Sequence, residues 1–201
     1  MRGDWNEARR MIEEDSSLLN AAITKEWGTL LHVVAGTNHV HFANQLVKLL
    51  DPPDLELRNF NGNTAFCYAA ASGNMEMAAM LIKQNEDLPK IRGGEEATPL
   101  YMAVLLRKGE MARHLYPLTT NILEEDDFTM LFFRCIKSEL YGEFISLLLP
   151  IDSSKFTCFF DKYLPMHINI LDHKQSRLKN NTQLVKYHIT NYSTFVLVNC
   201  V

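Results

Sequence analysis

A period of 34 to 35 residues in the first three quarters of the chain constrains its fold more than any other feature. The segment TLLHVVA at residues 29–35 returns as TAFCYAA at 64–70 and as TPLYMAV at 98–104. Threonine leads each copy, and small or apolar residues fill most of the positions that follow it. An internal repeat of this length indicates similar two-helix units that stack side by side, because one unit alone cannot bury its apolar face.

The second half of each copy carries an alanine and, three residues later, a leucine or methionine. This spacing places both residues on one face of a helix. The leading threonine is suited to cap the N-terminus of the helix that follows it, so we expect two short antiparallel helices in each unit. Running the period backwards gives a half repeat whose first helix is missing. The pairs are Ala8 and Met11, Ala43 and Leu46, Ala78 and Leu81, and Ala112 and Leu115.

The position between the two helices of a unit predicts a left-handed backbone. Glycine stands there in two copies, as Gly3 and Gly73, and asparagine stands there in a third, as Asn38. Both residue types adopt that backbone readily. The remaining copy has Arg107, whose side chain should make the same backbone cost about 1 kcal/mol. The sequence therefore predicts a strained turn at Arg107.

The period divides the chain into an array, residues 1–149, and a tail, residues 150–201. We expect an all-α solenoid of helix-turn-helix repeats, followed by a poorly defined C-terminal tail. Its units are a half repeat at 3–20, repeats near 27–52, 62–85 and 96–118, and a degraded repeat at 128–149. The degraded repeat is indicated by Met130, Leu131, Phe132, Phe144, Leu147 and Leu148.

These segments resemble the ankyrin repeat, whose signature is Thr-Pro-Leu-His-x-Ala-Ala followed by a turn glycine. Residues 98–100 keep Thr-Pro-Leu, and His32 keeps the signature histidine, which Cys67 and Tyr101 replace in the later copies. The resemblance implies an α-solenoid with short hairpin loops. It also implies a non-enzymatic module that binds other proteins.

Further segments resemble plant ankyrin-repeat proteins of the accelerated-cell-death and PGG-domain type: AAITK at 21–25, NGNTA at 61–65, and NEDLP at 85–89 with IRGGE at 91–95. Proteins of that group carry a cytosolic array and a membrane domain that opens with Pro-Gly-Gly, and they act in stress and defence signalling. Pro-Gly-Gly does not occur in this sequence. The resemblance implies an interaction module in a plant stress or defence pathway. The alternative is the truncated cytosolic part of a membrane-anchored signalling or transport-regulating protein.

Charge separates the array from the tail. The whole chain has a net charge of −4, but residues 1–149 hold 14 Lys or Arg against 21 Asp or Glu, a net charge of −7. An acidic array argues against nucleic acid or an anionic membrane surface as the partner. The tail has a net charge of +3 and a bias toward Phe, Ile, Lys, Asn and Tyr, as in translated AT-rich non-coding sequence. The alternative is a divergent cap, whose apolar residues would be Leu164, Met166, Ile168, Ile170 and 195–198.

Candidate reactive residues do not form a recognisable site. His39 and His41 have no third ligand at a supporting spacing, and the four cysteines form no Cys-x-x-Cys pair. The acidic run at 124–127 lacks the glycine of a calcium loop and is interpreted as a solvated turn between repeats. We therefore expect no catalytic residues, no cofactor and no metal. Scattered cysteines and the lack of a run of about 20 apolar residues favour a cytoplasmic protein without a membrane span.

The predicted functional feature is a partner-binding surface. In proteins with this resemblance, partners dock on the hairpin tips and on the exposed face of the first helices. An apolar patch rimmed by carboxylates would favour a protein ligand with aliphatic and basic groups. The alternative is that Leu105 and Leu106 only pack on the degraded repeat. Transferring the positions gives the tip residues Phe60, Asn61, Glu95 and Glu96, and the helix residues Tyr68, Ser72, Met102, Leu105 and Leu106.

Overall fold

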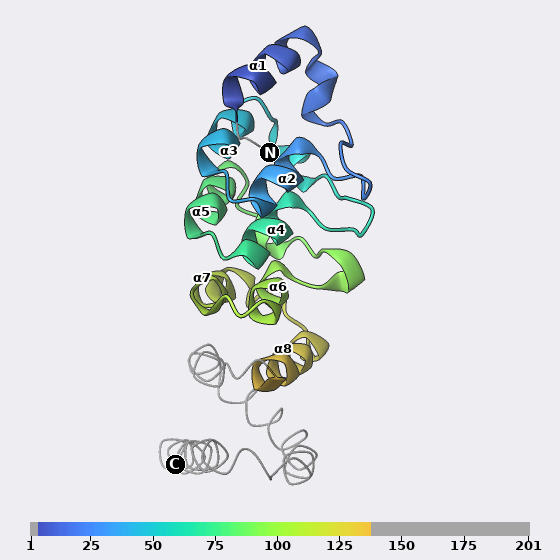
Figure 1. Ribbon diagram of the computed structural model, residues 1–201. Helices are drawn as coiled ribbons and strands as arrows, with labels where there is room; N and C mark the ends of the chain where they lie inside the picture. Colours follow the sequence, from blue (N-terminus) through green and yellow to red (C-terminus); the bar gives the residue numbers. More distant parts are fainter. Residues whose placement is uncertain (1–3, 138–201) are drawn as a thin grey trace, which may run out of the picture. The chain divides into compact units, whose positions relative to one another are not determined.

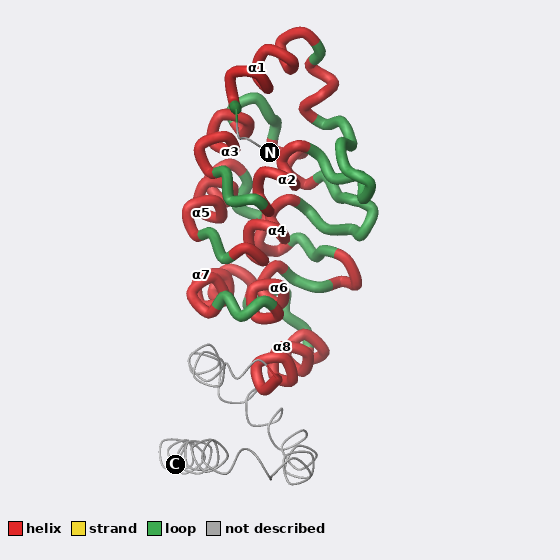
Figure 2. The backbone as a smooth tube through the Cα atoms, viewed as in Figure 1, coloured by secondary structure: helices red, strands yellow, loops and turns green. Residues whose placement is uncertain are grey.

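The computed structural model describes residues 4–137, in which helices alternate between an inner and an outer column (Figure 1). These residues contain no strand, so the predicted all-α class is confirmed (Figure 2). The inner helices are α2 (Leu30–Gly36), α4 (Ala65–Ser72), α6 (Pro99–Leu105) and α8 (Glu125–Lys137). The outer helices are α1 (Trp5–Glu14), α3 (Val40–Val47), α5 (Met75–Gln84) and α7 (Gly109–Thr119). Short 3₁₀ turns in the loops are η1 (Ser16–Leu19), η2 (Pro52–Glu56) and η3 (Leu88–Lys90), whereas η4 (Gly94–Glu96) is a turn with positive φ at Glu95 and Glu96.

A threonine precedes each of α2, α4 and α6, as the repeat predicts. The hydroxyl of Thr98 accepts a hydrogen bond from the backbone N–H of Tyr101 at 3.1 Å. In α2 the backbone N–H of Thr29 donates to Nδ1 of His32 at 3.1 Å. The threonine and the residue three positions later therefore close the first turn of these helices, which satisfies donors that a helix N-terminus leaves unpaired.

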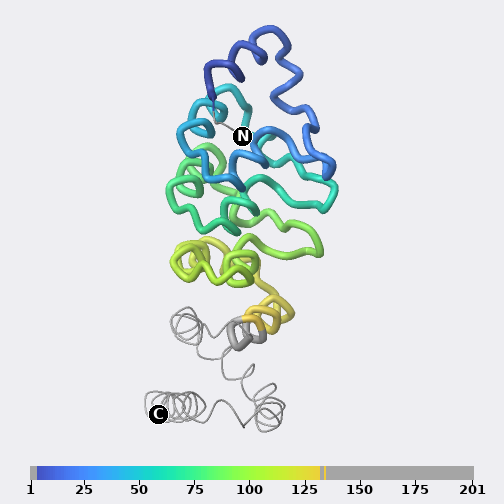
Figure 3. The backbone as a smooth tube through the Cα atoms, viewed as in Figure 1, coloured from blue at the N-terminus to red at the C-terminus, as the bar shows by residue number. Residues whose placement is uncertain are grey.

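Inner helices stack in chain order, α2 on α4, α4 on α6 and α6 on α8 (Figure 3). The predicted core positions of the outer helices are buried in the three full repeats: Ala43, Leu46, Ala78, Leu81, Ala112 and Leu115 are each at most 1% exposed. Alanine lets helices approach closely, and leucine fills the space between units. Met11 differs from its equivalents, because its side chain is 49% exposed.

The predicted left-handed turns are confirmed between the helices of the full repeats. Asn38, Gly73 and Arg107 have φ angles of 64°, 77° and 59°. The fourth member of this set, Gly3, lies outside the described residues. Glycine has no Cβ to strain this backbone, whereas arginine does, so Arg107 is held there by the helices on either side.

Replacing Arg107 with glycine should raise the free energy of unfolding by about 1 kcal/mol, because it removes the strain of a side chain at positive φ. Urea denaturation followed by circular dichroism measures the change. Arg107→Ala is the matched control, since it removes the exposed guanidinium but keeps the Cβ. An equal gain from alanine and glycine would show that the arginine side chain, and not the backbone, is unfavourable.

The fourth unit differs from its prediction. Helix α8 begins at Glu125, three residues before the predicted repeat, and residues 120–124 connect it directly to α7. This connection is too short for the hairpin that precedes α4 and α6. Residues 124–126 are exposed, as predicted, but the interpretation of the run as a turn is wrong, because residues 125–127 begin α8 and Asp127 is 5% exposed. The predicted second half of this unit, with Phe144, Leu147 and Leu148, and the tail at 150–201 lie outside the described residues.

Candidate partner-binding surface

The long loops before α2, α4 and α6 turn back at three hairpin tips. Each tip is closed by a backbone hydrogen bond, and adjacent tips are joined to each other. Phe60 N–H of the second tip donates to the carbonyl of Glu26 in the first at 2.7 Å, and Gly94 N–H of the third donates to Oδ1 of Asn63 at 3.0 Å. The closing bonds are Ile23 N–H to Gly28 O at 2.9 Å, Asn59 N–H to Asn63 O at 2.9 Å, and Gly93 N–H to Ala97 O at 2.7 Å.

Besides the left-handed turn between its two helices, each full repeat has a left-handed residue in its hairpin tip, again at the repeat spacing. Trp27, Gly62 and Glu96 have φ angles of 58°, 79° and 56°. They are 35 and 34 residues apart, so tryptophan and glutamate stand where the second tip has glycine. A left-handed backbone is rare for a residue as bulky as tryptophan, and strain of this kind is concentrated at functional sites.

Two aromatic side chains are exposed together at the first two tips. Trp27 is 64% exposed and Phe60 is 71% exposed. Their rings meet edge to face, with centroids 5.7 Å apart and planes at 75°. This geometry is favourable for an aromatic pair, yet most of the surface of both rings remains in water. Phe60 was predicted as a tip residue, and Trp27 was not.

The third tip carries the two predicted carboxylates. Glu95 and Glu96 are both exposed and both have positive φ, and Ala97 N–H donates to Gly94 O at 3.1 Å, as in a type I′ turn. Backbone atoms of Gly94 lie so close to Asn61 that a Cβ on Gly94 would overlap the carbonyl oxygen of Asn61. The structure therefore brings the exposed Asn61 next to this tip.

The five predicted helix residues are less accessible than the tips. Tyr68 is half-buried, and its hydroxyl accepts a hydrogen bond from Nδ2 of Asn59 at 2.8 Å. Ser72 is half-buried and donates its hydroxyl to the carbonyl of Ala69 at 2.8 Å, so it mainly serves the end of α4. Burial, and secondarily the charge of Glu26, raises the pKa of Tyr68.

On α6, Met102 and Leu105 are half-buried, and Leu106 at the C-cap is 50% exposed. The alternative interpretation of Leu105 and Leu106 was that they only pack on the fourth repeat. Helix α8 of that repeat does pack on α6, but half of the Leu106 surface remains in solvent. The predicted residues on α4 and α6 thus lie on neighbouring inner helices, and of these five residues only Leu106 is exposed.

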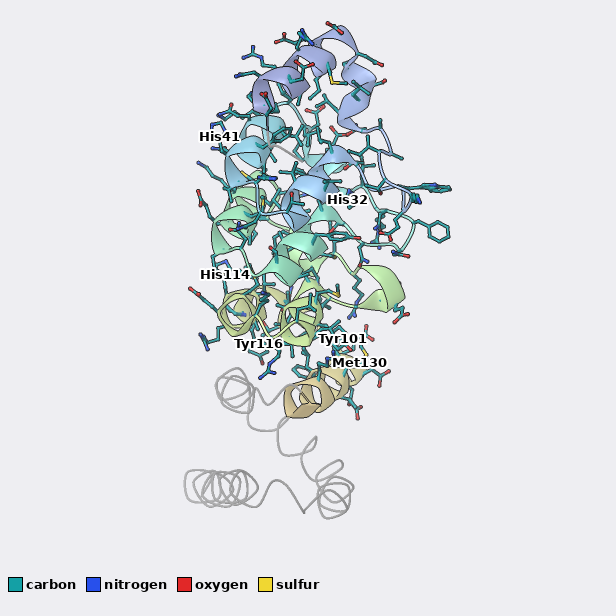
Figure 4. The ribbon with its side chains drawn as sticks, in the orientation of Figure 1. His32, His41, Tyr101, His114, Tyr116 and Met130 are labelled. Atoms are coloured by element: carbon teal, nitrogen blue, oxygen red, sulfur yellow. The ribbon has the colours of Figure 1, made fainter. Side chains whose placement is uncertain are left out.

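His32 connects the first full repeat to the second. Its Nδ1 accepts from Thr29 N–H, and its Nε2 lies 3.0 Å from the carbonyl oxygen of Asn63, which it can reach only as the Nε2–H donor. Figure 4 shows His32 on α2 in the inner column, whereas His41 and His114 lie on the outer helices α3 and α7. Burial lowers the pKa of His32, so the neutral imidazole is the form that this site holds.

Stability should therefore fall as the pH drops below 6.5. The folded pKa of His32 is below the ordinary value of 6.5, so the unfolded chain takes up the proton first. The contribution of His32 to stability is fully present above pH 6.5 and is lost progressively as the pH falls through the folded pKa. Urea midpoints measured between pH 5 and 8 test this expectation. The variant His32→Gln should flatten the curve between pH 5 and 6.5. A curve with the same slope in both proteins would assign the pH dependence to other groups.

Sequence reasoning missed an ion pair behind the third tip. The guanidinium of Arg92 donates to Oδ1 and Oδ2 of Asp127 at 2.8 and 2.7 Å. It also donates to the carbonyls of Glu96 and Ile122 at 2.9 and 3.1 Å. Burial alone would raise the pKa of Asp127, but the hydrogen bonds from Arg92 and from Glu124 N–H, together with the charge of Arg92, outweigh burial and hold that pKa below its ordinary value. The pair thus fixes the third tip to α8.

The described residues offer no metal or membrane-spanning feature. Within residues 4–137, no three His, Cys, Asp or Glu side chains are grouped as metal ligands. Burial raises the pKa of the Cys67 thiol, which contacts the hydroxyl of Thr64 at 3.5 Å, so it is a packed thiol in the folded protein. None of the helices in this part of the chain is long and apolar enough to cross a bilayer.

Comparison with known proteins agrees with the repeat architecture. A family model for ankyrin repeats in three copies matches residues 8–91 and 30–126, which together cover more than half of the chain. No curated protein matches the sequence. Among 107 matching chains of solved structures, one is from the crystal structure of the yeast ribosomal protein Rps3 in complex with its chaperone Yar1. That match has 20% sequence identity and a TM-score of 0.49, and covers 56% of this chain and 82% of that chain.

Proposed function

The chain belongs to the ankyrin-repeat family, and on that premise we propose that it is a non-enzymatic module whose protein partner docks on the hairpin tips and the adjoining faces of α4 and α6. The observation that carries this proposal is the exposed pair of Trp27 and Phe60. Ankyrin arrays use a rigid stack to present variable surface residues, and aromatic side chains dominate the energetics of protein interfaces.

Folding alone does not account for the aromatic pair. The part of each ring that stays in water contributes no hydrophobic free energy to folding. In addition, the left-handed backbone of Trp27 lowers the stability of the fold by about 1 kcal/mol. Two unfavourable features at one residue are expected where a partner covers the ring on binding. The same position in the second tip is Gly62, which shows that this turn does not need a side chain.

Charges near the tips indicate the chemistry of the partner. Glu26, Glu95 and Glu96 are exposed there, and Lys25 and Arg58 lie at the first two tips. The carboxylates predominate at the third tip, and α6, which follows this tip, carries Met102 and, at its C-cap, the exposed Leu106. A segment with an aliphatic or aromatic anchor and flanking basic groups would complement this surface.

Replacing Trp27 with glycine should weaken partner binding at least tenfold while stabilising the fold by about 1 kcal/mol. Glycine removes the exposed ring, which is the binding anchor, and also relieves the strain at positive φ. The immobilised chain is incubated with cell extract, and retained proteins are quantified by mass spectrometry for the native chain and the variant. Urea denaturation measures stability on the same samples.

Three further variants make the result specific. Phe60→Ala, and the pair Tyr68→Ala with Met102→Ala, should lose the same proteins as Trp27→Gly. Leu118→Ala on α7 is the matched control, because Leu118 is 36% exposed and lies on an outer helix. This variant should retain the same proteins as the native chain. An identical set of retained proteins for all variants would exclude the tips and inner faces as the binding surface.

We further propose that the module acts in plant stress or defence signalling. The support for this pathway is the resemblance of residues 21–25, 61–65 and 85–95 to the plant group described above. Fractionation of plant cells that express the chain tests it against the membrane-anchored alternative. Recovery with the cytosolic proteins supports the interaction module, and a pellet that resists carbonate extraction supports the membrane-anchored form.

A further inference from the structure

A groove of about 340 Å³ lies beside α2 at the amino end of the array. Its size falls within the range of about 300–1,000 Å³ that is usual for ligand sites. The groove is mainly apolar: α1 contributes Met11 and Ile12, α2 contributes Leu30 and Val34, and α3 contributes Phe42. Neither Trp27 nor Phe60 lines it, so it is a different surface from the proposed binding face.

The groove lies where the repeat would place one more inner helix. Each of α4, α6 and α8 packs on the inner helix that precedes it, but residues 4–137 place no inner helix before α2. The exposure of Met11 shows the consequence, because its side chain is 49% exposed whereas its equivalents Leu46 and Leu81 are at most 1% exposed. The shape that covers such a position in the other units is a helix of seven or eight residues.

The rim of the groove is acidic. Asp4 and Glu7 line it, and no lysine or arginine does. Residues 4–15, which form α1 and its caps, hold five carboxylates against the two arginines Arg9 and Arg10, a net charge of −3. Arg10 pairs with Glu7 at 2.6 Å and Arg9 pairs with Glu13 at 2.8 Å, which leaves the excess charge negative. A helix with basic residues beside its apolar face would complement this rim.

We propose that the groove binds an amphipathic, basic helix of a partner protein. Its apolar residues would cover Met11 and the half-buried Leu30, as an inner helix covers the equivalent positions in the later units. Its lysine or arginine side chains would lie against Asp4 and Glu7. This binding mode is that of a helix in a hydrophobic groove, and it operates independently of the hairpin tips.

Titration of the full chain with designed peptides tests the proposal. The probe is a peptide of about 14 residues with leucines at helical spacing on one face and lysines beside them, and the matched peptide has glutamate in place of lysine. Trp5 packs edge-on against Phe42, with centroids 5.1 Å apart, so its fluorescence reports on the groove. Trp27→Phe removes the other tryptophan signal. We expect saturable binding of the lysine peptide and at least tenfold weaker binding of the glutamate peptide.

Two variants locate the site. Met11→Lys should weaken binding of the lysine peptide at least tenfold, and Glu7→Lys should shift the preference toward the glutamate peptide. Leu118→Lys on α7 should change neither, and circular dichroism verifies that each variant is folded. Absence of saturable binding, or equal binding by the native chain and Met11→Lys, overturns the proposal. Dimers of the chain that Met11→Lys abolishes would also overturn it, because the occupant would then be a second copy.

Discussion

Replacing Asp127 with alanine should lower the free energy of unfolding by about 3 kcal/mol. The Asp127 side chain is 6% exposed, and its carboxylate accepts both hydrogen bonds from Arg92 and a third from Glu124 N–H at 2.8 Å. Alanine leaves the guanidinium of Arg92 without its counter-ion and removes the cap of α8. The lower end of the range for buried pairs applies, because the Arg92 side chain is 22% exposed.

Urea denaturation at pH 7, together with hydrogen exchange of α8, measures this loss. Asp126→Ala is the matched control, since Asp126 is the exposed neighbour in the same helix turn. Arg92→Met combined with Asp127→Leu should recover most of the stability, because an apolar pair does not leave a charge unpaired. The contribution of Asp127 is fully present above pH 3.8 and is lost as the pH falls, since its folded pKa lies below that value. Equal midpoints for Asp127→Ala and Asp126→Ala would contradict the role assigned to the pair.

Replacing Phe66 with alanine should destabilise the chain by about 3–5 kcal/mol. Phe66 is fully buried in α4, and α4 packs between α2 and α6, so the cavity weakens both interfaces of the central repeat. Because each unit of a repeat protein contacts only its neighbours, we also expect unfolding to become less cooperative. Phe66→Leu is the conservative control, with an expected loss of about 1 kcal/mol. A single sharp transition at the same midpoint for both variants would show that the cavity is closed by repacking.

Periodicity predicted the parts of the fold that repeat. The starts of α2, α4 and α6, the buried positions such as Ala78 and Leu81, and the left-handed turn at Arg107 each follow from one unit applied at intervals of 34 or 35 residues. These features depend on contacts between identical positions in neighbouring units. A single register therefore determines all of them, even though the signature residues vary.

Features that occur once could not be predicted in the same way. Arg92 and Asp127 are 35 residues apart, but their pairing depends on the short connection at 120–124, which breaks the period. The accessibility of a side chain depends on its neighbours in space. The sequence did not show that Tyr68 and Ser72 are half-buried and hydrogen-bonded to Asn59 and Ala69, which only the structure reveals. Trp27 could have been predicted from the sequence, because the period aligns it with Gly62 and so reveals a bulky residue at a turn position that favours glycine.

A main-chain hydrogen bond joins the first tip to the second, and the Asn63 side chain joins the second to the third. Helix α8 packs on α6 and is tied to the third tip by the Arg92 side chain. Arg92 reaches from the third tip to the carbonyl of Ile122 and to Asp127, and so replaces the hairpin that residues 120–124 lack. A point mutation cannot easily remove a contact made by the main chain, but it can remove this one. Loss of either Arg92 or Asp127 would therefore loosen α8 from the third tip while the backbone hydrogen bond between the first two tips stays in place.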